Sequence, residues 1–163
     1  MKKKIFVALV ILLVVIQFFR PTKNLSDERT YDVSTKYNVS EEVSSVLKVA
    51  CNDCHSNKTE YPWYAEIQPI AWWLNGHVTH GKGHLNFSAF TSRPIAIQYH
   101  KFEETIEMVK EGEMPLGSYT WLGLHPEASI TAEQRLILVK WAEAQMDSLK
   151  AQYPADSLIM KRR

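Results

Sequence analysis

The sequence predicts a mainly α-helical domain with an apolar segment in front of it. Apolar residues recur at helical spacing in several separate stretches, which begin at capping residues or end at glycines. No alternation of apolar and polar residues persists long enough to indicate a β-strand. A chain of 163 residues suits a single domain with appendages, and we expect this domain to span residues 39–150.

Net charge and cysteine content limit which partners and which disulfide bonds can be expected. The formal net charge is +1, which gives no electrostatic reason to expect nucleic acid as a partner. The chain contains two cysteines, both in one short motif. If that motif is used for chemistry, no disulfide framework is left to stabilise the fold.

Residues 1–21 have the features of an export signal. Three lysines at positions 2–4 precede an apolar run over residues 5–19, and such a basic start stays in the cytoplasm while the remainder is exported. The run is roughly 22 Å long as a helix, short of the ~30 Å hydrocarbon core, but no small-residue cleavage site follows it. We therefore expect an uncleaved membrane anchor rather than a cleaved signal. The domain would then lie on the periplasmic side of a bacterial inner membrane, or be secreted if the segment is cleaved.

The first helix of the domain is predicted to begin at Ser40. Residues 22–38 before it are polar and without periodicity, which favours a tether. Ser40 is a good N-cap residue, and two glutamates follow in the favourable first turn. The apolar stripe of this helix consists of Val43, Val46, Leu47 and Ala50.

Two more helices are predicted in the middle of the chain, with irregular segments beside them. The first begins near Pro69 and stops at Gly81, because proline favours a first turn and glycine favours a C-terminal end. The second runs from Pro94 to Glu111 and ends at Gly112.

The last helix is the best marked of all. Thr131 and Gln134 form a capping-box pattern, and apolar residues then continue at helical spacing to Ala144. Residues 151–163 are expected to form a tail, frayed from Tyr153 onward.

Cys51, Cys54 and His55 form the clearest chemical motif of the chain. Two cysteines separated by two residues, with a histidine directly after the second, are typical of covalent attachment of haem c. On a helical turn the three side chains share one face. Both thiols can then form thioethers at one edge of a porphyrin while the imidazole reaches the iron. We predict one haem c per chain, with His55 as an iron ligand.

Uses of the two cysteines without haem are less well supported. A structural zinc site needs four ligands, and no second Cys-x-x-Cys is present. A dithiol oxidoreductase carries its motif after a strand in a βαβ unit, and no such unit is predicted.

Met114 is the candidate for the second axial ligand. It follows the helix stop at Gly112 and precedes Pro115, whose fixed φ stiffens the backbone where a ligand must be positioned. Ligation by histidine and methionine raises the reduction potential relative to stronger donors. The alternative is ordinary core packing, which is what most methionines do.

Three histidines offer an alternative to a methionine ligand. His77, His80 and His84 recur at ligand-like spacing on or near the second predicted helix, which would suit a bis-histidine haem. They are also typical of surface side chains near a helix C-terminus, and a five-coordinate iron is a third arrangement. Lys82 and Arg93 lie in the segment expected to wrap the haem and are candidate partners for its propionates, or else solvated cations.

With these residues in view, the chain resembles the bacterial haem-binding domain family of small, exported, single-haem cytochrome c-like proteins. The matching stretches are Cys51-Asn52-Asp53-Cys54-His55-Ser56-Asn57, Tyr61-Pro62-Trp63-Tyr64, Leu85-Asn86-Phe87-Ser88, Gly112-Glu113-Met114-Pro115 and His125-Pro126. The resemblance covers about residues 40–144. It implies a mainly α cytochrome c-type fold in which the first and last helices cross and the haem sits between them. It also implies His55 as proximal ligand and Met114 as distal ligand.

The arrangement of ligands separates two functions. Closed His/Met ligation leaves no vacant iron position, which favours a membrane-tethered carrier of single electrons whose redox partners the sequence does not identify. An open or easily displaced sixth position would instead suit a peroxidase-like enzyme or a gas or redox sensor.

Overall fold

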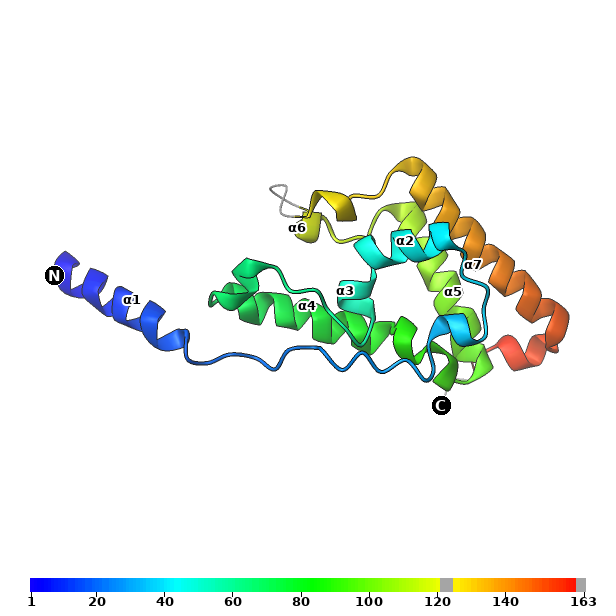
Figure 1. Cartoon of the computed structure of the whole chain (residues 1–163), viewed down its shortest axis with the longest axis horizontal. Helices are drawn as coiled ribbons and strands as arrows, with labels where there is room; N and C mark the ends of the chain where they lie inside the picture. The colour runs from blue at the N-terminus through cyan, green and yellow to red at the C-terminus, as the bar shows by residue number, and fades with distance from the viewer. Residues whose placement is uncertain (121–124, 161–163) are drawn as a thin grey trace.

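The described part of the chain, residues 1–120 and 125–160 of a computed structural model, is mainly α-helical and contains no β-sheet (Figure 1). This confirms the predicted class. The helices are α1 (Lys2–Ile16), α2 (Glu41–Ala50), α3 (Asn52–His55), α4 (Ile70–His84), α5 (Ile95–Glu111), α6 (Gly117–Thr120) and α7 (Ala132–Gln152). The short 3-10 turns η1 (Val33–Thr35), η2 (Trp63–Glu66), η3 (Phe87–Ser92) and η5 (Pro126–Ala128) lie between them, and η6 (Ala155–Leu158) follows α7.

Local signals set several helix ends where they were predicted. The Ser40 hydroxyl accepts a hydrogen bond from the backbone N–H of Val43 (3.3 Å) at the start of α2. Gly112 adopts φ +80° and ends α5, a conformation that glycine reaches without a steric penalty. Thr131 and Gln134 make both hydrogen bonds of the capping box at the start of α7 (3.1 and 2.8 Å).

The end of α4 differs from the prediction. The helix continues through Gly81 and ends at His84. Gly81 is therefore an interior helical position, and its lack of a side chain has a packing reason that the sequence pattern does not reveal.

The hydrophobic core lies among α2, α5 and α7, which lie together on one side of the molecule (Figure 1). Phe102 of α5 and Leu138 of α7 are fully buried. The ring of Tyr37 meets Phe102 edge to face at 4.9 Å, and the indole N–H of Trp141 donates to the Asn38 carbonyl (2.8 Å). The core therefore includes side chains from the segment in front of α2.

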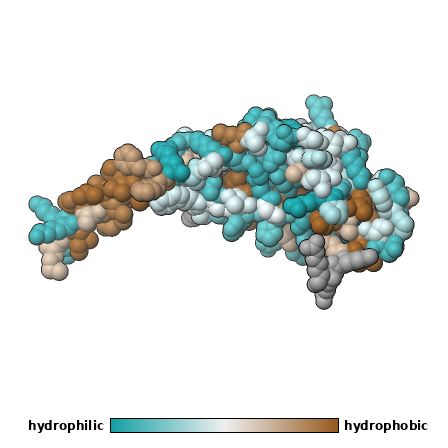
Figure 2. Space-filling view, turned by 90° about the horizontal axis from the view of Figure 1, so that it is seen from below, coloured by the Kyte–Doolittle hydropathy of each residue, from teal (hydrophilic) through white to brown (hydrophobic). Residues whose placement is uncertain are grey.

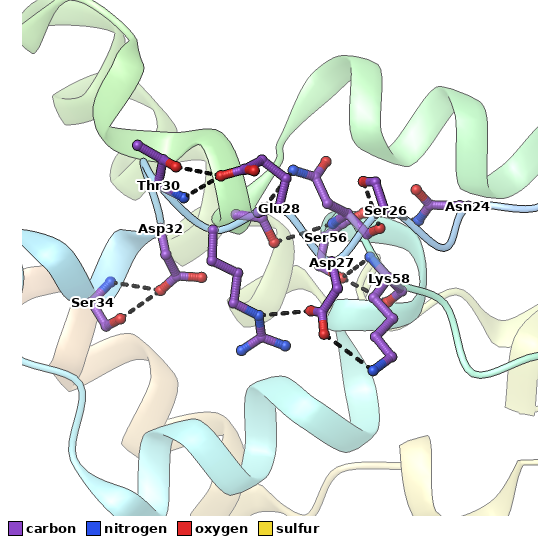
Figure 3. Close-up of polar contacts among 12 residues, drawn as sticks. Asn24, Ser26, Asp27, Glu28, Thr30, Asp32, Ser34, Ser56 and Lys58 are labelled. Carbon is purple, nitrogen blue, oxygen red and sulfur yellow. Dashed lines mark hydrogen bonds and ion pairs between the residues drawn. The ribbon is translucent and has the colours of Figure 1, made fainter.

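Residues 22–38, for which we predicted a tether, run alongside the domain. Leu25 forms an antiparallel bridge with Lys58 in the loop that follows α3. The Lys58 amine also forms an ion pair with Asp27 (3.1 Å; Figure 3). Further along, Val33 and Tyr37 are buried in the core. The segment thus holds the loop after the cysteine motif in place.

The expected tail also contributes to packing. Beyond α7, η6 lies against α5, and the side chain of Leu158 is buried in the core. Residues 161–163 lie outside the described part of the chain.

At the other end, α1 projects away from the domain, and its side chains are exposed along almost the whole helix (Figures 1 and 2). Within residues 1–120 and 125–160, no helix combines the length and the apolar character needed to cross a membrane.

Candidate functional site

The cysteine motif forms a single helical turn directly after α2. Cys51 ends α2 and begins α3, and its carbonyl accepts hydrogen bonds from the N–H groups of Cys54 (3.2 Å) and His55 (2.9 Å). These bonds close the turn, so that the residues three and four positions apart lie on one side of it. Burial raises the pKa of the Cys51 thiol to about 12 and that of Cys54 to about 11.

Helix α4 packs against this turn at Gly81. A Cβ atom at Gly81 would lie 2.7 Å from the carbonyl oxygen of Cys54 and 3.0 Å from its Cβ atom. The carbonyl oxygen is part of the backbone and the Cβ atom is bonded directly to it, so neither atom can rotate away from Gly81. Glycine is therefore needed here because only a bare backbone lets α4 approach the motif this closely.

Replacing Gly81 by alanine is expected to push the motif turn away from α4. We expect a loss of stability of about 1–3 kcal/mol, the usual penalty for overpacking, together with a lower haem content per chain. Thermal unfolding and the haem-to-protein absorbance ratio measure the two effects. Gly83→Ala is the matched control, because a Cβ atom at Gly83 meets nothing within 4 Å. An equally stable Gly81→Ala protein with full haem content would contradict this role.

The imidazole of His55 is held in a defined orientation. Its Nδ1 lies 3.0 Å from the carbonyl oxygen of Leu85, at the end of α4. Since a carbonyl can only accept, Nδ1 carries the proton of this bond and Nε2 keeps its lone pair. Burial lowers the pKa of His55, although its backbone hydrogen bonds oppose the shift. The neutral form with a free Nε2 is the form that binds a metal.

A hydrogen-bonded network ties the residues after His55 to the start of η3. The Asn86 amide donates to the side-chain oxygen of Asn57 (2.8 Å), and the Asn57 backbone N–H donates to the Ser88 hydroxyl (3.1 Å). Asn86 also accepts from the Ser88 backbone N–H (3.0 Å), which caps η3. These polar residues belong to the stretches that carry the family resemblance. Their hydrogen bonds join the chain directly after His55 to the chain directly after Leu85.

A second network holds the other side of the motif turn. The Asp53 carboxylate accepts from the Glu60 backbone N–H (2.8 Å) and from the Tyr119 hydroxyl (2.7 Å). Burial, followed by the contact with Asp53, raises the pKa of Tyr119. The Tyr119 ring stacks on His125 at 4.2 Å, and His125 is hydrogen-bonded to Tyr64 through Nε2. The network joins two more of the stretches on which the resemblance rests, around Tyr64 and His125.

A cavity of about 720 Å³ opens beside the motif, within the ~300–1,000 Å³ typical of cofactor pockets. Its wall is predominantly apolar and comes from the end of α2, from α3, α4, the start of η3 and α5, and from the segment after α5. Helix α7 supplies none of the described lining residues. Cys51, Cys54 and His55 all line this cavity.

Met114 lines the same cavity from another part of the chain. Its backbone N–H donates to the carbonyl of Met108 (3.1 Å), which folds the segment after Gly112 back against α5. Pro115 also lines the cavity, as does Met108 itself. The structure therefore brings Met114 to the cysteine motif, and it adds a second methionine that sequence reasoning did not single out.

The three candidate histidines also line this cavity, from one face of α4. His77, His80 and His84 follow one another at intervals of three and four residues, which places them on one side of the helix. The Trp73 ring lies 4.4 Å from the His77 ring, and the Trp73 carbonyl lies 2.9 Å from His77 Nδ1. The cavity therefore offers imidazole as well as thioether donors.

Lys82 and Arg93 do not line this cavity. They line a neighbouring cavity of about 250 Å³, which shares His84, Leu85 and Lys101 with the larger one. The Lys82 amine donates to the Asn24 side chain (2.6 Å), and burial lowers its pKa. Lys101 is the cation that faces both cavities, and it forms an ion pair with Glu104. Lys101 was not singled out from the sequence.

No cluster of three His, Cys, Asp or Glu side chains suited to a metal ion is present in the part of the chain that the structure describes. The cavity itself fits a large apolar cofactor with an iron-binding centre, because it combines two thiols, imidazoles and thioethers on an apolar wall. These features define a helical cofactor-binding domain.

Comparison with known families assigns the class more closely. Residues 11–144 match the family described as the haem-binding domain. The chain therefore belongs to the haem-binding domain family, which confirms the resemblance and the haem as its ligand. No curated protein and no solved structure matches the chain.

Proposed function

We propose that the chain binds one haem c covalently through Cys51 and Cys54, ligates its iron with His55 and Met114, and carries single electrons. The observation that carries this proposal is that all four side chains line one cavity of about 720 Å³. Met114 belongs to a different part of the chain from the motif. Met114 therefore lies at the same cavity because of the fold, and not because it is close to the motif in sequence.

A haem in this cavity supplies a one-electron iron couple, and the surrounding residues hold and shield it. The Leu85 carbonyl orients His55, and Gly81 admits the motif turn against α4. Trp72, Trp73 and other apolar side chains line the wall. We propose a cytochrome c-type arrangement, although the described lining residues come from α2 to α5 and from the segment after α5, and none comes from α7.

We further propose that the haem carboxylates are neutralised at the junction of the two cavities. The smaller cavity is lined by Lys82, Arg93 and Lys101, and none of its described lining residues is acidic. Charge-assisted hydrogen bonds to carboxylates are the stronger kind. This supports Lys82 and Arg93 as propionate partners and adds Lys101 to them.

A second function has a specific observation in its favour. His77, His80 and His84 line the same cavity as His55, which would suit bis-histidine ligation. A five-coordinate iron, bound by none of them and by neither methionine, is the other arrangement. With either arrangement the protein would act as a peroxidase-like enzyme or as a gas or redox sensor.

The export of the domain is also a proposal. Residues 1–21 combine three lysines with an exposed apolar helix. We propose that they carry the domain to the periplasmic side of a bacterial inner membrane, where its redox partners would be found.

Absorption spectra of the ferric and ferrous holoprotein, with and without carbon monoxide, test the proposed ligation. We expect a low-spin spectrum with a sulfur-to-iron band and no carbon monoxide binding at neutral pH. Both follow from a closed iron centre with a thioether ligand. Rapid carbon monoxide binding at neutral pH would rule out the electron-carrier proposal and support the enzyme or sensor.

A further inference from the structure

The end of α1 is attached to the domain through Gln68, a buried residue between η2 and α4. The Gln68 side chain is 2% exposed. The Gln68 backbone N–H donates to the side-chain oxygen of Gln17 (2.9 Å), and the Gln68 backbone carbonyl accepts from the side-chain amide of Gln17 (3.2 Å). The Gln68 amide also donates to the Phe19 carbonyl (2.7 Å). Three of the polar contacts of this buried residue therefore come from residues 1–21.

A second contact lies beside the first one. The Glu66 carboxylate forms ion pairs with both Arg20 and Lys23. Glu66 is two positions before Gln68, and the two basic residues lie four and seven positions after Ile16, the last residue of α1. The chain is thus held to η2 and the start of α4 over several residues, which fixes the point where α1 leaves the domain.

Exposed apolar side chains surround this point. We call them the apolar collar; they are Phe18, Phe19, Trp63, Ile67 and Ile70. Trp63 is 76% exposed and Phe18 is 82% exposed. A cluster of large apolar side chains on the surface marks a place that another apolar body covers. Tryptophan and tyrosine are enriched where a protein meets the membrane–water interface.

Helix α1 identifies what covers the collar. From Ile5 to Ile16 it carries no polar residue, so no side of it is suited to water. A helix that is apolar all round belongs in a core or in lipid, yet α1 projects from the domain and is exposed (Figure 2). A protein partner would bury one face of it, whereas lipid covers every face. The collar continues this apolar surface directly.

We propose that residues 1–21 remain part of the mature protein and that the apolar collar rests on the surface of a lipid bilayer, with α1 entering the lipid. The inference rests on the proposed export of the domain. To the proposed export, the inference adds a fixed orientation of the domain on the membrane. The reason is that α4 is one helix that begins at the collar and lines the proposed haem cavity. The rise of a helix places Gly81, against which Cys54 packs, about 17 Å from Ile70.

The first test is the intact mass of the holoprotein isolated from the membranes of a bacterial host that attaches haem c. We expect a mass that includes residues 1–21, and protein that stays with the membranes in alkaline carbonate. A mature chain that begins after residue 21 would overturn the inference. Such a result would not contradict the proposed haem ligation, because the absorption spectrum of the same sample tests the ligation independently.

The second test asks whether the collar touches lipid. The holoprotein is reconstituted into vesicles of phosphatidylethanolamine and phosphatidylglycerol that contain brominated lipid, which quenches tryptophan fluorescence on contact. Among the described tryptophans Trp63 is the most exposed, at 76%, whereas Trp72 and Trp73 line the cavity and are less exposed. Trp63→Phe keeps the surface apolar and removes this tryptophan, so we expect the quenching to fall. Trp141→Phe removes a buried tryptophan of α7 and is the matched control, in which the quenching should remain.

Two results would overturn the role of the collar. One is equal quenching in the wild-type protein and in both variants, which would place Trp63 away from lipid. The other is a dimer of the full chain in detergent that Ile67→Ser/Ile70→Ser dissociates, because the collar would then bind a second copy. Leu136→Ser on α7, also an exposed apolar position, is the control for the double variant.

Discussion

Replacing both Cys51 and Cys54 by serine is expected to abolish covalent haem attachment completely. These are the two cysteines of the chain, and both line the cavity beside His55. A serine hydroxyl is close in size but cannot form a thioether. Haem staining after denaturing electrophoresis should vanish, and acidified organic solvent should extract any haem that remains in the cavity.

Three further variants sharpen this test. Cys51→Ser and Cys54→Ser, each alone, are expected to keep one bond and to show the shifted spectrum of a singly attached haem. Asn52→Ser places a serine in the same turn without removing a thiol and should stain like the wild-type protein. A stained band in the double variant would mean that the cysteines do not attach the haem. Zinc binding or dithiol chemistry would then become the better explanation of the two cysteines.

The parts of this site that follow from neighbouring residues were predictable. The motif lies in one helical turn, and the caps at Ser40 and Thr131 each depend on residues three positions away. Such contacts are set by the geometry of the helix itself. The pattern of the sequence therefore suffices for them.

The contacts that orient the motif were not predictable, because they join distant residues. Gly81 was interpreted as a helix stop from its intrinsic preference. In the structure it lies inside α4, because the approach of Cys54 requires a residue without a side chain. The bond between His55 and the Leu85 carbonyl has the same character. Backbone acceptors carry no signal in the sequence.

The candidate partners of the haem propionates show why the sequence does not tell which face of a helix meets a cavity. Lys82 lies two positions from both His80 and His84, so the helix turns its side chain away from the face that these histidines share. Proximity in sequence pointed to Lys82, which lines the smaller cavity, but it did not point to Lys101 of α5, which lines both cavities. The face of a helix that meets a cavity depends on how the helix packs, and this is a property of the whole fold.

Replacing Met114 by alanine is expected to remove the sulfur-to-iron band and to make the ferric haem high-spin or bound to another ligand. The reduction potential should fall, because a thioether favours the ferrous state. We expect a drop of more than about 60 mV, since 59 mV corresponds to a tenfold change for a one-electron couple. Spectroscopy and a redox titration of the holoprotein measure both.

Met108→Ala is the matched control for this prediction. Both methionines line the cavity, and the Met114 backbone N–H is hydrogen-bonded to the Met108 carbonyl, so both substitutions remove a thioether from one region of the wall. Since alanine keeps that backbone bond at either position, the comparison isolates the side chain. If Met108→Ala loses the band and Met114→Ala keeps it, the thioether ligand is Met108.

The histidines provide the remaining comparison. If the spectrum and the potential are unchanged in both methionine variants, the sixth ligand is an imidazole of α4. Single alanine substitutions at His77, His80 and His84 then identify it, because all three line the cavity from one face of the helix. In a His/Met protein the same three substitutions should leave the sulfur-to-iron band intact. The two ligand sets therefore predict opposite outcomes for the same group of variants.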